Sequence, residues 1–194
     1  WDEIAALASR GAVVMAIDPR GIGETRAALE TKGSDWPAWF GDYDSAMTAV
    51  LLSRPLAGMR AFDIARGFAL LAARADVDGG RIHGAGRGTG AAVPLLHAAA
   101  LGVPFASLLL DAMPVSYQAI VETPIHRGVF EDVVTGALRH YDLPDLAASL
   151  APRAVRLVDA ADPLGNTLAV DAVRREWSRA PHVSIGRRAP EEAA

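Results

Sequence analysis

The stretch His83-Gly84-Ala85-Gly86-Arg87-Gly88-Thr89-Gly90 decides how this sequence folds, because it joins a short strand candidate to a helical pattern through a glycine-rich loop. A loop in that position needs glycine for one of two physical reasons. Glycines let backbone N–H groups approach an anion at a helix N-terminus, or they relieve the crowding of a strained strand-to-helix turn. Either reason predicts a strand followed by a helix that packs back on it.

Five short runs bounded by Gly, Pro or Asp are the strand candidates. They are Ala12–Ile17, Arg81–Gly84, Phe105–Leu110, Ala154–Val158 and His182–Ile185. The first, third and fourth are almost continuously apolar, which is typical of strands that are covered on both faces of a parallel sheet. The second is assigned mainly from the glycine-rich loop that follows it.

Helical patterns alternate with these runs. They cover Trp1–Arg10, Gly58–Arg74, Ala91–Leu101 and Thr167–Arg179. In the second of them, apolar residues at helical spacing that begin with Phe62 predict the buried face, and Arg60 is placed on another face. Alternating strands and helices predict right-handed crossovers. The sequence therefore predicts one α/β domain over residues 1–194, with an open, mostly parallel sheet of about five strands and flanking helices.

Composition excludes several classes of protein. The chain has 194 residues, of which 51% are hydrophobic, and a net charge of −4. A core is therefore expected, and no general attraction to nucleic acid or anionic membranes is. The absence of cysteine excludes disulfides and thiolate metal sites, and no pair of histidines has the spacing of a zinc motif. We expect neither a metal nor a cofactor.

Two segments stand apart from the alternation of strands and helices. Residues 24–55 contain Trp36, Trp39 and Phe40, and residues 113–150 contain His126 and His140. Insertions of this length at the edge of a sheet often act as lids. Alternatively, their aromatic side chains only pack the loops onto the domain.

The glycine-rich loop at residues 84–90 also allows a dinucleotide or phosphate site. The run that begins at Gly86 and ends at Ala91 matches G-x-G-x-x-A if the additional Gly90 is disregarded. Asp111 ends the next strand candidate, near the position where a ribose-binding acid is expected. Binding at this loop is therefore an alternative function.

The order of several segments resembles the acetyl xylan esterase and glucuronoyl esterase-like branch of the α/β-hydrolases. The matching pieces are the turn Asp18–Thr25, the run Arg54–Asp63, Ala75–Asp78 ahead of Arg81, the glycine-rich loop, and Tyr141–Leu146 leading to Ala151-Pro152-Arg153. The resemblance covers most of residues 11–180. It implies a serine carboxylic-ester hydrolase without a cofactor, a carbohydrate ester or another small acyl ester as substrate, and a location outside the cytoplasm.

The catalytic residues that the resemblance implies are only partly present. Aligning residues 84–88 with G-x-S-x-G places Gly86 at the nucleophile position, and the backbone N–H of Arg87 becomes the oxyanion donor. The acid of the triad falls on Asp162. The histidine expected after the last strand has no counterpart in Gly186–Ala194. The triad is therefore degenerate, and we predict an inactive domain.

The resemblance further implies that strands and an oxyanion loop of the usual sheet lie ahead of Trp1, so that residues 1–194 form a truncated domain. The sheet edge near Ala12–Ile17 would then be unpaired. An unpaired edge favours pairing with another strand, and we expect either self-association or a missing N-terminal segment. An active esterase with an unrecognised nucleophile stays open as an alternative.

Overall fold

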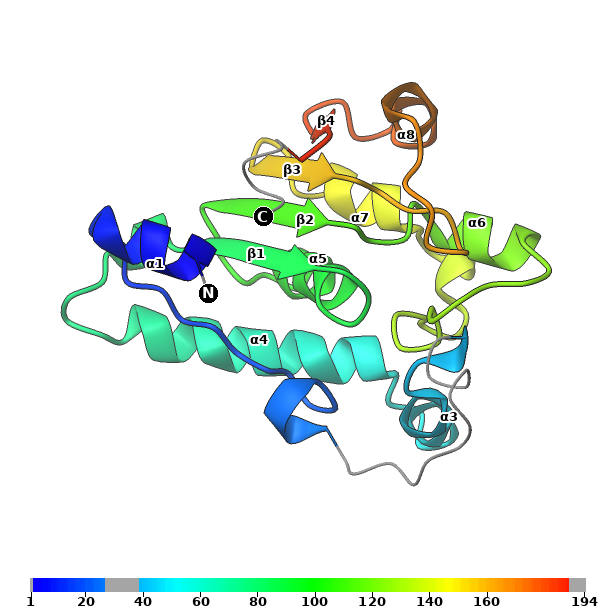
Figure 1. The fold of residues 1–194 in the computed structure, drawn as a ribbon, viewed down its shortest axis with the longest axis horizontal. Helices are drawn as coiled ribbons and strands as arrows, with labels where there is room; N and C mark the ends of the chain where they lie inside the picture. The colour runs from blue at the N-terminus through cyan, green and yellow to red at the C-terminus, as the bar shows by residue number, and fades with distance from the viewer. Residues whose placement is uncertain (1, 27–38, 189–194) are drawn as a thin grey trace.

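The computed structural model describes residues 2–26 and 39–188, and its four described strands form one parallel sheet in the order β1-β2-β3-β4 (Figure 1). The strands are β1 (His83–Arg87), β2 (Ser107–Asp111), β3 (Ala154–Val158) and β4 (Ser184–Gly186). All neighbouring strands are parallel. The fold class is therefore α/β, as the sequence predicts.

Helices connect the strands. The α-helices are α1 (Asp2–Ser9), α3 (Tyr43–Leu51), α4 (Leu56–Ala72), α5 (Ala92–Ala100), α6 (Tyr117–Glu122), α7 (Leu143–Ala148) and α8 (Val170–Glu176). Among the described residues, the short 3₁₀ turns are η1 (Gly23–Thr25), η2 (Gly79–Arg81) and η3 (Ala137–Arg139). No described helix is both long and apolar enough to cross a bilayer.

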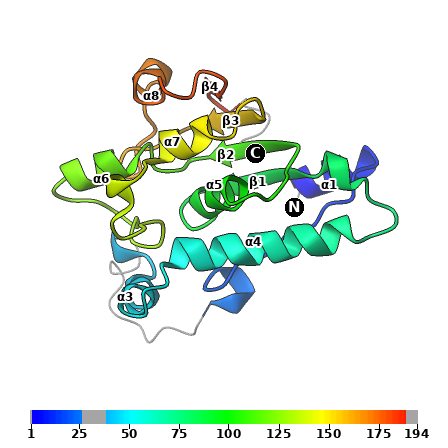
Figure 2. The same ribbon diagram turned by 180° about the vertical axis from the view of Figure 1, so that it is seen from behind.

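Helix α5 is the centre of the core. It packs on β1 and β2, and it contacts α4 and α7 as well (Figure 2). Every residue from Ala92 to Ala99 is buried, which is typical of a helix that is apolar on all sides. Pro94 lies in its first turn, where the missing N–H has no intrahelical partner to lose. The helix therefore begins at Ala92, after the glycine-rich loop has ended.

The strands differ in how clearly the sequence predicts them. Strand β3 has the predicted bounds, and β2 begins two residues later and ends one residue later than Phe105–Leu110. Strand β1 begins two residues after Arg81 and continues through the first glycines of the loop. Strand β4 begins two residues later and ends one residue later than the expected strand at His182–Ile185.

The expected strand at Ala12–Ile17 is not part of the sheet. Its residues have no regular secondary structure, and the sheet has four strands among the described residues rather than about five. The segment follows α1 and runs beside the free edge of β1 and along α4 (Figure 1). An apolar run forms a strand only where a neighbouring strand pairs with its backbone, and here no described strand does.

The buried face of α4 also differs from the prediction. Phe62 is 61% exposed, whereas Arg60 is fully buried. The buried residues are Leu56, Ala57, Arg60, Ala61 and Ile64, which share one face at helical spacing. Arg60 can lie there because its guanidinium donates hydrogen bonds to Glu131 and to the Arg20 carbonyl.

We predict that Leu110→Ala destabilises the protein by about 2–5 kcal/mol, because truncating a fully buried leucine on a central strand leaves a cavity. Urea unfolding monitored by tryptophan fluorescence measures the loss. Leu101→Ala is the matched control, since Leu101 is 77% exposed and its truncation should change the free energy of unfolding by less than about 0.5 kcal/mol. Equal losses in the two variants would contradict the assignment of the core.

Candidate functional site

Three neighbouring strands end in the same way at the carboxyl edge of the sheet, where open α/β sheets bind their ligands. The residue directly after β1 is Gly88, with φ of +74°. The residues directly after β2 and β3 are Ala112 and Asp159, with φ of +51° and +49°. Left-handed conformations are costly for residues other than glycine and tend to cluster at functional sites. This edge is therefore the candidate site.

Gly86 and Gly88 have different surroundings. Gly86 lies inside β1, and a Cβ added to it would be 2.9 Å from the Ala91 carbonyl oxygen and 2.9 Å from the Ala92 Cα. Gly88 begins the turn, and a Cβ added there would meet no atom of the described residues within 4 Å. The glycine at 86 is required by the packing of α5, whereas the glycine at 88 faces open space.

Charged side chains form ion pairs along the edge. The Nε of Arg87 lies 3.6 Å from Oδ2 of Asp111, which also accepts a hydrogen bond from Arg188. Arg187 lies 3.6 Å from the carboxylate of Asp159. Arg87, whose backbone N–H is the expected oxyanion donor, is the last residue of β1, and its side chain is 60% exposed. These pairs connect the ends of β1, β2, β3 and β4.

Asp162 lies in the loop after β3, and its carboxylate is engaged within that loop. Its Oδ1 accepts hydrogen bonds from the backbone N–H groups of Leu164 and Asn166, and its Oδ2 accepts one from the Asn166 side chain. Burial acts to raise the pKa of Asp162, but these hydrogen bonds outweigh it and lower the pKa. The carboxylate therefore stays ionised and holds the turn.

No histidine in the described ranges is hydrogen-bonded to a carboxylate. His97 is buried on α5 and contacts the Val93 carbonyl and the Tyr141 hydroxyl, and burial lowers its pKa. His126 packs edge-on against Phe130 with ring centroids 4.9 Å apart. Residues 2–26 and 39–188 also contain no cluster of His, Asp and Glu that could hold a metal ion.

A buried polar cluster, which the sequence analysis did not predict, contacts the glycine-rich loop at Gly90. Arg60 Nη1 donates to Oε2 of Glu131 at 2.7 Å, and Arg60 Nε donates to the Arg20 carbonyl at 2.9 Å. The fully buried Asp132 accepts a hydrogen bond from the Gly90 N–H at 2.8 Å. The cluster joins α4 and the 18–25 turn to the glycine-rich loop and the segment 113–150. A charged residue on the apolar face of α4 was the signal that could have indicated it.

The cluster leaves two buried polar atoms without a hydrogen bond to the described residues, namely Arg60 Nη2 and Asp132 Oδ2. Burial raises the pKa of Asp132 to about 7, and the hydrogen bond from Gly90 acts in the opposite direction. The backbone carbonyl of Asp132 in turn accepts a hydrogen bond from the Tyr117 hydroxyl at 2.7 Å. Asp132 is therefore a carboxyl group of the cluster whose pKa lies well above that of an ordinary aspartate.

The two segments expected to act as lids contact each other through aromatic rings. Phe130 lies 6.4 Å from Phe40 and 5.1 Å from Tyr43 between ring centroids. Arg127 N–H donates to the Pro163 carbonyl beside Asp162. Segment 126–132 thus reaches from the loop after β3 to the glycine-rich loop. Trp36 lies outside the described residues, and a lid function stays a prediction.

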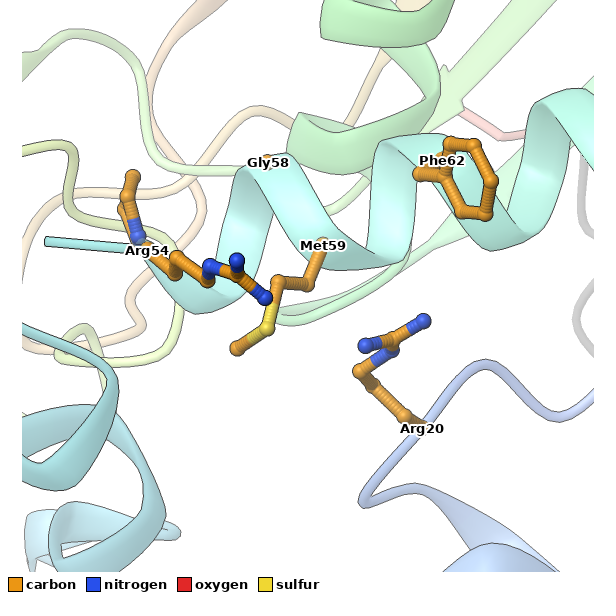
Figure 3. Close-up of a pocket in the computed structure, with 6 residues that line it drawn as sticks. Arg20, Arg54, Gly58, Met59 and Phe62 are labelled. Atoms are coloured by element: carbon orange, nitrogen blue, oxygen red, sulfur yellow. The ribbon is translucent and has the colours of Figure 1, made fainter. Parts of the chain in front are cut away.

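A separate cavity of about 360 Å³ lies between the 18–25 turn and α4. Figure 3 shows Met59 and Phe62 on the helix, with Arg20 and Arg54 beside them. The guanidinium of Arg20 is held by Asp63 through two hydrogen bonds, of 2.8 and 2.5 Å. This ion pair attaches the turn to α4, and the cavity contains none of the residues that the sequence analysis assigned to catalysis.

Comparison with known proteins supports the fold. No family model and no curated protein matches the sequence. Among solved structures, the chain is similar to a "putative acetyl xylan esterase" from Bacteroides fragilis, with a TM-score of 0.70 and 17% sequence identity. The two chains therefore share a fold. The similarity covers 96% of this chain and 49% of the other, so the chain spans about half the length of that structure.

We predict that Asp132 makes the protein less stable as the pH rises. Its pKa in the folded state is about 7, above the value of about 3.9 for an unperturbed aspartate. The folded state therefore binds the proton more tightly, and this contribution to stability is complete below pH 4 and is lost as the pH rises through about 7. Relative to Asp132→Asn, the free energy of unfolding should fall by on the order of 3 kcal/mol over this range.

Urea unfolding of both proteins between pH 4 and 8 measures this difference. Asp171→Asn is the control, because the side chain of Asp171 is 81% exposed and its replacement should leave the pH dependence unchanged. Parallel stability curves for the protein and Asp132→Asn would show that Asp132 is not protonated near neutral pH.

Proposed function

We propose that this chain is an α/β-hydrolase domain of carboxylic-ester hydrolase ancestry that does not hydrolyse esters by itself. The observation that carries the proposal is the residue at the turn after β1. In a nucleophile elbow, the serine occupies the strained turn between a strand and a helix. Here that turn is made by Gly88, with positive φ and open space above it, and glycine has no side chain that could attack an ester.

The geometry favours Gly88 rather than Gly86 as the vacant position. The motif G-x-S-x-G then corresponds to residues 86–90, and the oxyanion donor is the backbone N–H of Thr89 in place of Arg87. A serine at residue 86 would press against the backbone of α5. This shift by two residues leaves the proposal unchanged, because both positions are glycine.

The acid and histidine positions of the triad also argue against ester hydrolysis. Asp162 is our candidate for the acid position, yet its carboxylate already accepts three hydrogen bonds within its own loop. No described histidine is bonded to it. In well-studied serine hydrolases, loss of the nucleophile alone reduces kcat by about 10⁶-fold. A site without nucleophile and base should therefore show no turnover above buffer.

The dinucleotide alternative receives less support from the contacts of the loop. The N–H of Gly90, which a phosphate would need, already donates to Asp132. Asp111, the proposed ribose ligand, is paired with Arg188. The hydrogen-bond acceptor at this loop is thus supplied by the protein itself. Titration with NAD, NADP or ATP, followed by tryptophan fluorescence, should show no saturable change at micromolar ligand.

The ligand class also remains a proposal. By resemblance, the carboxyl edge would face a carbohydrate ester or another small acyl ester, outside the cytoplasm. The charge of −4 gives no reason to expect nucleic acid or a membrane surface as a partner. The domain would retain a binding or structural role without turning the ester over.

We predict that the chain hydrolyses p-nitrophenyl acetate no faster than buffer, and that a fluorophosphonate probe labels no residue of it. Release of p-nitrophenolate and mass spectrometry of the treated protein measure the two outcomes. Turnover that is abolished by Asp162→Ala, or labelling of a hydroxyl group in the chain, would show that a nucleophile exists and would overturn the proposal.

Two serine variants test the assignment of the vacant position. Gly88→Ser should fold with a conformational cost of about 1–2 kcal/mol for its left-handed backbone. Gly86→Ser should lose more stability, because its Cβ meets the backbone of α5. Neither should gain turnover, since no histidine among the described residues is hydrogen-bonded to a carboxylate. A Gly86→Ser variant that is the more stable of the two in urea unfolding would contradict the assignment.

A further inference from the structure

An apolar cavity of about 500 Å³ lies between α6 and the segment 133–139. Helix α6, which forms one of its walls, lies beyond the carboxyl ends of the strands (Figure 1). We propose that this cavity, here called the amphiphile pocket, binds a small molecule that has an apolar chain with a carboxylate at one end. None of Gly88, Asp111 and Asp162 lines the pocket, so the inference is independent of the proposed function.

The lining of the amphiphile pocket is apolar over most of its surface. Helix α6 contributes Tyr117, Ile120 and Val121, and the segment 133–139 contributes two valines, an alanine and Leu138. Ile120 is buried, whereas Val121 is 71% exposed, so the pocket has a closed floor and a rim that meets water. A concave apolar surface of this kind gains free energy when an apolar group covers it. The pocket therefore takes the apolar part of a ligand.

One end of the pocket is charged. Arg139 is the only charged residue that lines it among the described residues. Arg139 and Leu138 also line a second, polar cavity of about 580 Å³, so the two cavities adjoin there. No ion pair or side-chain hydrogen bond joins Arg139 to another described residue. An unpaired guanidinium at the end of an apolar pocket complements a carboxylate, which it binds through charge-assisted hydrogen bonds.

The acidic residues of the polar cavity leave the charge of Arg139 available. The carboxylate of Asp142 accepts hydrogen bonds from three backbone N–H groups. Asp145 forms an ion pair with another arginine that lines the same cavity. Glu176 and Arg175 line it as well, and because their charges are opposite they add no net charge. Arg139 is therefore the group that selects an anionic end for the ligand.

The walls of the amphiphile pocket are held in place by hydrogen bonds within the protein. The Tyr117 hydroxyl donates to the Asp132 carbonyl at 2.7 Å, and its backbone N–H donates to Asp142 at 2.6 Å. On the opposite wall, the backbone N–H of Arg139 donates to the Gly136 carbonyl at 3.1 Å within the turn η3. A preformed site loses little free energy to ordering when a ligand binds. The pocket therefore has the rigidity that a small-molecule site needs.

Titration of the chain with octanoate at neutral pH, followed by its backbone amide chemical shifts in NMR spectra, tests the proposal. Octanoate should bind in the millimolar range or tighter, as expected for a ligand of this size, and should shift the amides of residues 117–121 and 133–139. Octanol has the same chain without the charge, and it should bind about fivefold more weakly. Butanoate, with a shorter apolar chain, should cause no saturable shift.

Two pairs of variants locate the two ends of the ligand. Arg139→Gln should weaken octanoate about fivefold and leave octanol unchanged. Its control, Arg174→Gln, alters an exposed arginine outside both cavities and should change neither ligand. Val121→Asp adds a carboxylate to the apolar rim and should weaken both ligands by about tenfold or more. Ile125→Asp is the matched control, because Ile125 is 66% exposed and does not line the pocket.

The proposal would be overturned by any of three kinds of result. Absence of a saturable shift with octanoate, or equal affinity of octanoate for the protein and for Arg139→Gln, would show that the pocket does not hold a carboxylate. Equal losses in Val121→Asp and Ile125→Asp, or shifts confined to other segments, would show that octanoate adheres elsewhere. A dimer in sedimentation velocity that both octanoate and Val121→Asp dissociate would show that a second copy of the chain occupies the pocket.

Discussion

The close approach of α5 to β1 is the constraint on which the fold and the candidate site both depend. A side chain at Gly86 would collide with the backbone at Ala91 and Ala92, and one at Gly84 would press on the end of the Leu95 side chain, so the strand needs glycine at residue 86. Because α5 also contacts β2, α4 and α7, this glycine-lined contact determines where the central helix lies. It places Gly88 at the start of the turn and leaves the glycine-rich loop with no nucleophilic side chain there.

The buried polar cluster is the second organising feature. Fully buried Arg60 is acceptable only because Glu131 and the Arg20 carbonyl receive its hydrogen bonds, since an unpaired buried charge is very costly. Asp132 continues the cluster to Gly90. These contacts hold segment 113–150 against the glycine-rich loop. The carboxyl edge therefore has ion pairs and left-handed residues directly after its strands, as functional sites often do. The carboxylates of Asp111, Asp159 and Asp162, however, are engaged in local contacts.

Much of the fold could be predicted from local patterns. Strand β3 has the predicted bounds because Ala154–Val158 is an apolar run between a proline and an aspartate. Strand β1 was harder, because glycine carries no periodicity of polarity and the loop could not be told from the strand. The face of α4 was assigned wrongly, because the burial of Arg60 depends on Glu131, a residue 71 positions later in the chain. The helix sequence places Arg60 on an apolar face, but it does not indicate which distant residue pairs with it.

By itself, the sequence determined the α/β class, the order of its elements and the lack of a serine and a terminal histidine in the motifs that resemble an esterase, because these follow from residue types and their local spacing. Only the tertiary structure decided which glycine forms the turn, that Asp162 is engaged within its own loop, and that Ala12–Ile17 stands apart from the sheet. Each of these depends on contacts between segments far apart in the chain. An apolar run specifies that it can form a strand, but pairing requires a neighbour, and the neighbour is a property of the assembled fold.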